Sequence, residues 1–226
     1  GLAPLRETVA ASLLQFMQWK RKYPLHDGFA GSGTIPIEAS LYAYNIPPGI
    51  NRSFAFEDFH CFGTETTKMI EDCLKEKAVK DVRLDCKVRI SASDIDSSAV
   101  SLCEANYERA AVVIGRALNE YGRNEHIPRL EFYSSDFKDL QMQYDEGMII
   151  SNPPYGKRLG EKEAVLELYV DIARKMRELK GWKMGFLSTQ DEFTQIFHKE
   201  NKSLNIKAHP IKMGNMQMHF YIASNI

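Results

Sequence analysis

The stretch Asp27-Gly28-Phe29-Ala30-Gly31-Ser32-Gly33-Thr34 decides the fold of this chain. It follows apolar Leu25 and precedes an apolar segment over 35–44, so it predicts a turn between a strand and a helix. Open α/β sheets bind ligands at such turns, because small residues let the backbone approach closely and the helix N-terminus offers free N–H groups. The spacing G-x-x-G-x-G, without a P-loop lysine, argues against a dinucleotide or ATP. Taken alone, the motif also fits a purely structural turn.

Strands and helices alternate along the rest of the chain, which implies βαβ units and a mostly parallel α/β sheet. The last two expected strands are separated only by Lys212-Met213-Gly214-Asn215, so they must pair as an antiparallel hairpin at the sheet edge. Residues 50–86 form an expected insertion with an aromatic segment and a charged helix. Further strands are expected near 88–92, 130–133, 147–151, 184–187, 206–211 and 218–223, and helices near 4–16, 35–44, 65–80, 97–113, 165–176 and 191–197.

Composition sets broad limits on the protein class. The 226 residues suffice for one α/β domain, and the net charge of −1 provides no global basic field for binding a nucleic acid. No apolar run approaches the ~18 residues of a membrane span and no signal peptide begins the chain, so a cytoplasmic location is the default expectation. The cysteines, which lack metal-ligand spacing, are expected to be reduced thiols outside any zinc site: Cys61, Cys73, Cys86 and Cys103.

Two acidic residues follow later strands of the expected sheet. Asp94 ends the strand after the insertion, where a carboxylate can accept both hydroxyls of a ribose. Asp136 ends the next strand and can accept a hydrogen bond from an adenine amine. An aspartate after a strand is as often a helix cap or a turn residue, so each position is weak evidence alone. We expect Ser97 to be the N-terminal cap of the helix that follows Asp94.

Asn152-Pro153-Pro154-Tyr155 carries the most specific chemistry, because such a tetrapeptide arises by chance in about one chain of this length in a thousand. The lone pair of a nucleobase amine is delocalised into its ring. If the Asn152 side-chain oxygen and the Pro153 carbonyl each accept an N–H, that lone pair is directed at an electrophilic methyl group. The prolines fix the turn, and Tyr155 can stack on a base that has left its helix. No strong general base is needed, because the methylated amine becomes acidic.

These segments, together with Asn45 to Glu57 (NIPPGINRSFAFE) and Asn152 to Leu159 (NPPYGKRL), resemble the THUMP-associated RNA guanine-N2 methyltransferases. Many proteins of this family are labelled N6-adenine-specific DNA methylases. The resemblance covers nearly the whole chain. It implies a Rossmann-like class I methyltransferase fold, with a seven-stranded, mostly parallel sheet and an antiparallel last strand. It departs from the usual pattern at Gly28 and Ala30, where the family has Pro and Cys, so cofactor affinity is open to change.

The resemblance also implies the roles of the site residues and the partners. S-adenosylmethionine is the implied cofactor, held by Asp27, Gly28, Phe29, Ala30, Gly31, Ser32, Gly33, Thr34, Asp94, Ile95, Asp136 and Phe137. The implied catalytic residues, which hold the target amine, are Asn152, Pro153, Pro154 and Tyr155. Apart from the resemblance, the positive charges of Lys157, Arg158 and Lys162 beside the motif favour a phosphate-bearing substrate, with Lys157 and Arg158 as the expected contacts, and solvated charges are an equal alternative. The RNA substrate is expected to be ribosomal rather than transfer RNA.

Residues 1–22 are expected to be a helix or linker from an upstream RNA-binding domain that this chain lacks, and residues 23–226 the methyltransferase domain. Oligomeric state is not readable from the sequence. Three rival functions use the same motifs: an N6-adenine DNA methyltransferase, a glutamine-N5 protein methyltransferase, and a catalytically silent cofactor-binding subunit. A silent subunit usually loses acceptor-site residues, whereas Asn152 to Tyr155 are intact.

Overall fold

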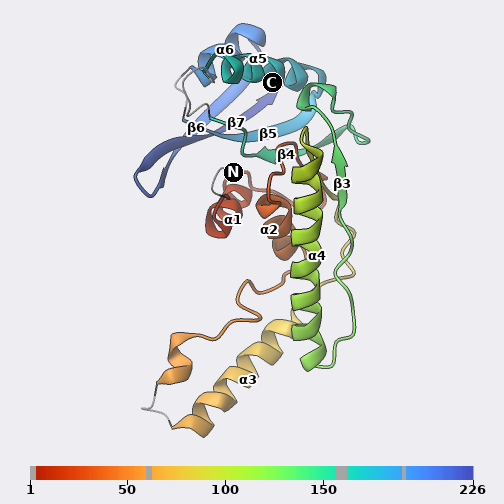
Figure 1. Cartoon of the computed structure of the whole chain (residues 1–226), viewed down its shortest axis with the longest axis vertical. Coiled ribbons are helices and arrows are strands. Elements are labelled where there is room, and N and C mark those ends of the chain that lie inside the picture. The colour runs from red at the N-terminus through yellow and green to blue at the C-terminus, as the bar shows by residue number, and fades with distance from the viewer. Residues whose placement is uncertain (1–3, 60–62, 156–161, 190–191, 226) are drawn as a thin grey trace.

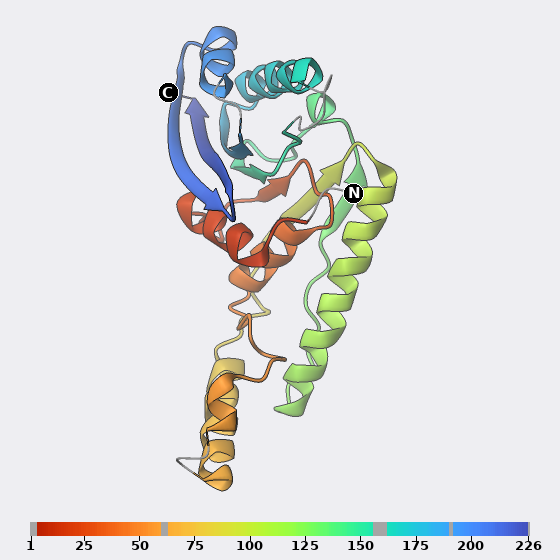
Figure 2. The same cartoon turned by 60° about the vertical axis from the view of Figure 1, so that its left-hand side comes forward.

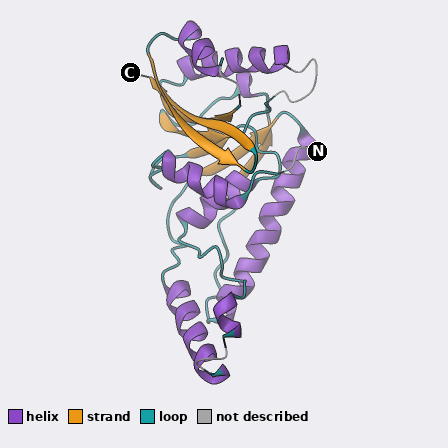
Figure 3. Ribbon diagram, turned by 90° about the vertical axis from the view of Figure 1, so that its left-hand side faces the viewer, coloured by secondary structure: helices purple, strands orange, loops and turns teal. Residues whose placement is uncertain are grey.

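A seven-stranded sheet with helices on both faces organises the chain (Figures 1 and 3). The computed structural model describes residues 4–59, 63–155, 162–189 and 192–225. The strand order is β3-β2-β1-β4-β5-β7-β6. The strands are β1 (Leu25–Asp27), β2 (Ile90–Asp94), β3 (Glu131–Ser134), β4 (Glu146–Ser151), β5 (Gly181–Ser188), β6 (Leu204–Met213) and β7 (Met216–Asn225).

The pairing of the strands confirms the predicted topology. The ladders from β3 through β5 are all parallel, while β7 pairs antiparallel with both β5 and β6. In the central register His26 of β1 lies between Ser91 of β2 and Ile149 of β4. The carboxyl ends of β1, β2 and β4 therefore lie at one edge of the sheet, which brings Asp27, Asp94 and Ser151 close together.

Two hydrophobic cores hold the layers together. Helices α1 (Glu7–Phe16), α2 (Thr34–Ala43) and α4 (Ser97–Glu120) cover one face, where Leu13 and Ala39 join Ile150 of the sheet. Helices α5 (Lys162–Glu178) and α6 (Phe193–Glu200) cover the other face, with Tyr169 and Phe193 against the β4–β5–β7 region. Among the described helices, none is both long and apolar enough to cross a membrane.

Two local features refine the sequence-based expectations. Asp96, not Ser97, caps α4: its extended backbone lets its carboxylate accept from the Ser98 N–H at 2.8 Å, while Ser97 is already helical. Helix α1 packs on the domain through buried Leu13 and Leu14, so it contributes to the core of the methyltransferase fold. Whether residues 1–22 also join an upstream domain stays a prediction.

The insertion forms an arm that projects away from the sheet (Figures 1 and 2). It carries the short helix η1 (Ala55–Asp58) and helix α3 (Thr64–Lys80), close to the predicted span. The base of the arm is fixed to the domain, because the Arg123 guanidinium donates to the carbonyls of Val79 and Val82, each at 2.8 Å. Arg83 N–H also donates to the Tyr44 carbonyl at 2.8 Å.

Candidate functional site

The glycine turn between β1 and α2 adopts a conformation that requires glycine at two positions. Gly31 and Gly33 have φ angles of +50° and +85°, in the left-handed region. A Cβ atom on Gly33 would lie 2.6 Å from Sγ of buried Cys103 in α4. Asn106 of the same helix donates its side-chain N–H to the Ser32 carbonyl at 2.7 Å. The turn is therefore held from outside by α4 and leaves its backbone open to a ligand.

Replacing Gly33 with alanine is expected to destabilise the fold by about 3 kcal/mol, from the left-handed φ and the overlap with Cys103. Gly122 is a matched control, because its φ is +76° and a Cβ there would meet nothing within 4 Å. Gly122→Ala should cost only the conformational part, about 1 kcal/mol. Urea unfolding of both variants measures the difference. Equal losses would show that α4 does not constrain the turn.

Asp27 ends β1 and is almost fully buried, at 1 % exposure. Burial raises the pKa of its carboxyl from 3.8 to about 7, against the lowering effects of hydrogen bonds from the Ser151 hydroxyl and the Phe29 N–H. Ser151 also accepts the Gly28 N–H at 2.9 Å. This serine was missed by the sequence analysis; its place directly before Asn152 was the available signal. It joins the glycine turn to the Asn152 loop.

The raised pKa of Asp27 predicts how the unliganded protein responds to pH. The folded state keeps the proton up to about pH 7, whereas the unfolded chain releases it near 3.8, so this group's contribution to stability falls as pH rises through that window. Asp27→Asn removes the ionisation. The variant should gain about 2 kcal/mol over the wild type between pH 5 and pH 8, measured by urea unfolding. Parallel pH curves for the two proteins would refute the assignment.

Asp94 lies at the carboxyl end of β2, facing the glycine turn. Its two carboxylate oxygens accept the backbone N–H groups of Gly31 at 3.0 Å and Asp96 at 3.1 Å. The side chain is half-buried, and each oxygen retains a further lone pair. A diol can therefore bind here without displacing either backbone donor. Ile95 follows with 69 % of its surface exposed, beside the carboxylate.

Asp136 and Phe137 begin the short helix η3 (Phe137–Asp139) after β3. Asp136 caps it by accepting the Lys138 N–H at 3.2 Å, and also forms an ion pair with the Lys138 ammonium at 3.0 Å. Its contact with an adenine amine stays a prediction. The Phe137 ring is buried and stacks on Phe29 at 5.1 Å, which commits it to packing. A Cβ on Gly28 would lie 2.5 Å from that ring, which explains why glycine suits this position.

The loop after β4 presents the proposed acceptor groups. The Asn152 side-chain oxygen is buried and has no hydrogen-bond partner among the described residues. Pro153 is buried, while Tyr155 is half-buried and the pKa of its hydroxyl is raised by burial. A buried acceptor without a partner is costly, so this oxygen is arranged for a donor that arrives with a ligand. Lys157 and Arg158 lie outside the described residues.

The predicted cofactor residues fit a nucleoside sulfonium. The turn at Gly31 and Gly33 has room for close backbone approach, and the half-buried Asp94 carboxylate can accept two hydroxyls. Buried Asp27 would be favoured as a carboxylate by a cationic ligand nearby. Ser151, whose hydroxyl accepts the Gly28 N–H, directly precedes Asn152, whose oxygen has no partner among the described residues. The geometry thus joins the glycine turn to the Asn152 loop through Ser151; nucleoside binding by the turn and amine binding by Asn152 stay predictions.

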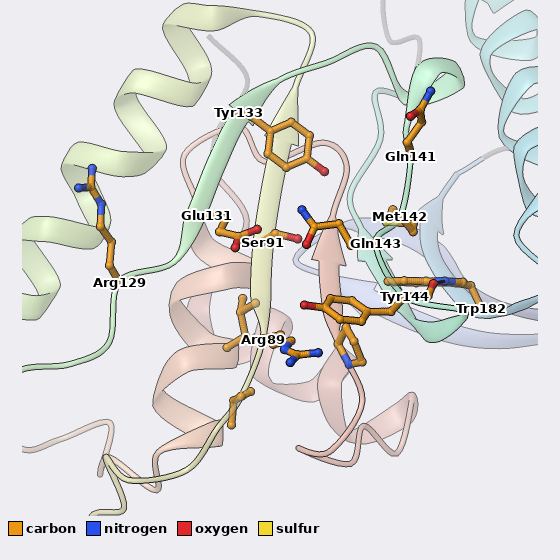
Figure 4. A pocket seen from close by; sticks show the side chains of 13 residues that line it. Arg89, Ser91, Arg129, Glu131, Tyr133, Gln141, Met142, Gln143, Tyr144 and Trp182 are labelled. Carbon is orange, nitrogen blue, oxygen red and sulfur yellow. Dashed lines mark hydrogen bonds between the residues drawn. The ribbon is translucent and has the colours of Figure 1, made fainter.

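A separate cavity of about 410 Å³ lies toward the amino ends of the strands (Figure 4). The connection from β3 to β4 contains only the short helix η3 among its described residues. This part of the sheet is therefore not covered by a long helix, whereas α5 and α6 cover the sheet elsewhere. Ser91, Glu131, Tyr133 and Gln143 face it, and the Arg89 guanidinium lies 4.3 Å from the Tyr144 ring centroid. Its described lining contains none of the predicted site residues.

His26 is another buried polar residue that the sequence analysis did not single out. Its ring nitrogens lie 2.9 Å from the Ser91 hydroxyl and 3.1 Å from the Ser93 hydroxyl. Burial lowers its pKa to about 3, so the imidazole is neutral near neutral pH. With both nitrogens partnered inside the sheet, His26 ties β1 to β2 and is not positioned as a general base at the Asn152 loop.

The sheet order, the antiparallel final pair and the glycine turn after β1 define a Rossmann-like class I methyltransferase domain, whose cofactor is S-adenosylmethionine. Residues 1–220 match the family model for the RMKL-like methyltransferase domain, and the chain belongs to this family. The resemblance noted in the sequence is thereby confirmed.

Individual relatives support the same assignment. The chain is 35 % identical over 200 residues to Bacillus subtilis YpsC, whose name marks it as a provisional RNA methyltransferase, covering 88 % of this chain and 47 % of YpsC. It is 35 % identical over 195 residues to the ribosomal RNA large subunit methyltransferase K/L of Shewanella sediminis, covering 85 % of this chain and 25 % of that protein. The chain therefore spans half or less of the length of these relatives.

Among solved structures, SMU.472, a provisionally assigned methyltransferase in complex with SAH, superposes on the chain with a TM-score of 0.79 and 26 % identity. The match covers 100 % of this chain and 54 % of SMU.472. The fold is thus shared over the whole chain.

Proposed function

We propose that this domain transfers a methyl group from S-adenosylmethionine to the exocyclic N2 amine of a guanine in RNA, with ribosomal RNA the favoured substrate. The observation that carries the proposal is the buried Asn152 oxygen, which has no partner among the described residues and follows Ser151, the residue that bonds the glycine turn. The names of YpsC and of the Shewanella enzyme support RNA as the substrate class. Guanine N2 rests on the family resemblance of the sequence.

In this mechanism the acceptor loop orients the target amine. The Asn152 oxygen and the Pro153 carbonyl each accept one N–H, which turns the nitrogen lone pair away from the base and toward the methyl group. Tyr155 provides a ring face for the base, which must leave its stack to enter the site. Asn152 and Pro153 directly follow the end of β4, where Ser151 accepts the Gly28 N–H, so the two acceptors lie close to the glycine turn.

The proton balance requires no strong base. When bound, S-adenosylmethionine would supply an electrophilic methyl group on a cationic sulfur and leave as neutral S-adenosylhomocysteine. The methylated amine would be acidic and would release one of its two protons to water. The Asn152 oxygen would accept a hydrogen bond from an N–H of the amine while positive charge develops on the nitrogen, which stabilises that charge.

The test is transfer of tritiated methyl groups from S-adenosylmethionine to unmodified total RNA, genomic DNA and cell protein in parallel, followed by nucleoside and amino-acid analysis. A longer form of the protein, with any sequence that precedes residue 1, is run beside this chain. N2-methylguanosine in RNA is the expected product. N6-methyladenine in DNA, or N5-methylglutamine in protein, would replace the proposal with the corresponding rival. Cofactor binding without transfer by either form would indicate a silent subunit.

A further inference from the structure

Helix α3 of the arm exposes a stripe of apolar side chains. Met69, Ile70 and Leu74 are 69 %, 43 % and 54 % exposed, and Cys73 between them is also exposed. Thr67 and Val79, near the two ends of the helix, are its buried residues, so the stripe lies between two points where α3 is anchored. Residues at this spacing lie on one helical face. A cluster of large apolar side chains on a projecting element is typical of an interaction surface.

The charges on α3 limit the kinds of partner that can bind to its apolar stripe. The helix carries four lysines and four carboxylates, so it has no net charge and is poorly suited to a polyanion such as RNA. The charges are unevenly placed. The first half, 64–72, has Glu65, Glu71 and Asp72 against Lys68, a net charge of −2, and the second half, 73–80, has Lys75, Lys77 and Lys80 against Glu76, a net charge of +2. The surface is therefore complementary to itself when reversed.

We propose that α3 forms a dimer by pairing antiparallel with α3 of a second copy of this chain. The apolar stripe, 69–74, lies near the middle of the helix, so a two-fold axis through it sets Met69 against Leu74 of the other copy. The same axis brings the acidic half of each helix beside the basic half of its partner, and opposes the two helix dipoles. Glu65 and Lys80, on the same side of the stripe, become neighbours across the interface.

The arm is built to present this surface rigidly. Its base is held by the Arg123 hydrogen bonds to the Val79 and Val82 carbonyls and by the Asn45 side-chain N–H, which donates to the Asp81 carbonyl at 3.0 Å. A fixed helix loses little conformational freedom on association, which favours binding by a small surface. The arm projects away from the sheet (Figure 2).

The direct test is sedimentation velocity of the full chain over a roughly hundredfold range of concentration, where a concentration-dependent dimer is expected. Ile70→Asp should raise the dissociation constant at least about 100-fold, because the change acts twice across a two-fold interface. Val112→Asp is the matched control: Val112 is 53 % exposed on α4, outside the arm, and should leave the dimer unchanged. Circular dichroism verifies that both variants are folded.

Charge reversal then tests the antiparallel arrangement. Lys80→Glu and Glu65→Lys should each weaken the dimer about threefold to tenfold, and the double variant should regain most of the affinity. A short bis-maleimide should link two copies through Cys73, and Cys73→Ser should abolish the product. A monomer at every concentration, or a dimer that Ile70→Asp leaves intact, would overturn the proposal. These outcomes are independent of methyl transfer.

Discussion

Asn152→Ala is expected to slow methyl transfer about 10²–10³-fold while changing the dissociation constant for S-adenosylhomocysteine less than about threefold. The alanine removes one of the two acceptors that orient the target amine, but it touches none of the groups assigned to the cofactor. Single-turnover transfer of tritiated methyl groups measures the rate, and calorimetric titration measures the affinity. The variant is compared with the wild type on the same RNA.

The thermal stability of Asn152→Ala distinguishes a role of Asn152 in orienting the target amine from a role in holding the fold. The Asn152 oxygen is buried without a partner among the described residues, so its removal deletes an unsatisfied polar atom and should leave the melting temperature unchanged or higher. Asn201→Ala provides the contrast: its side chain bonds Asn225 and the Ser203 N–H, so that variant should lose stability. Transfer at the wild-type rate by Asn152→Ala would exclude the proposed mechanism.

The local parts of the site were accessible from the sequence because each is encoded by neighbouring residues. Spacing after an apolar strand predicts both the turn at Gly31 and Gly33 and the position of the acid Asp94. The alternation of strands and helices also fixed the sheet class, and the short link at 212–215 required the antiparallel hairpin. In these cases the physical rule acts over a few residues.

The parts that the sequence could not provide depend on contacts between distant segments. Ser151 meets Gly28 across 123 positions, and Asn106 meets Ser32 across 74. Each has an ordinary local role as a strand end or a helix surface residue, and only the packed sheet brings it to the turn. The cap of α4 shows a smaller limit: Asp96 and Ser97 both suit that position, and backbone geometry decides between them.

The direction of the insertion illustrates the same limit. Periodicity placed a helix near 65–80, yet the apolar residues Met69 and Ile70 gave no reason to expect that they face outward. The orientation follows from hydrogen bonds at the base of the arm, including Arg123 to Val79, which lies 44 positions away. A pattern of apolar residues identifies a helix face, whereas the tertiary contacts determine what that face meets.

Asp94→Ala should raise the dissociation constant for S-adenosylhomocysteine about 100-fold, because two hydrogen bonds from ribose hydroxyls to a carboxylate are lost together. The substitution also frees the Gly31 N–H from its acceptor at 3.0 Å, which loosens the turn. Asp94→Asn retains one acceptor oxygen and should give an intermediate loss of about tenfold. Calorimetric titration with each variant provides the ranking.

Asp96→Ala separates this ligand effect from a general disturbance of the loop. Asp96 is exposed and caps α4, so its loss should cost about 1 kcal/mol of stability without a matching loss of cofactor affinity. Asp94→Ala, saturated with cofactor, should retain a transfer rate near that of the wild type, since the Asn152 loop is unchanged. If Asp94→Ala and Asp96→Ala weaken binding equally, the carboxylate of Asp94 holds the loop and does not bind the ribose.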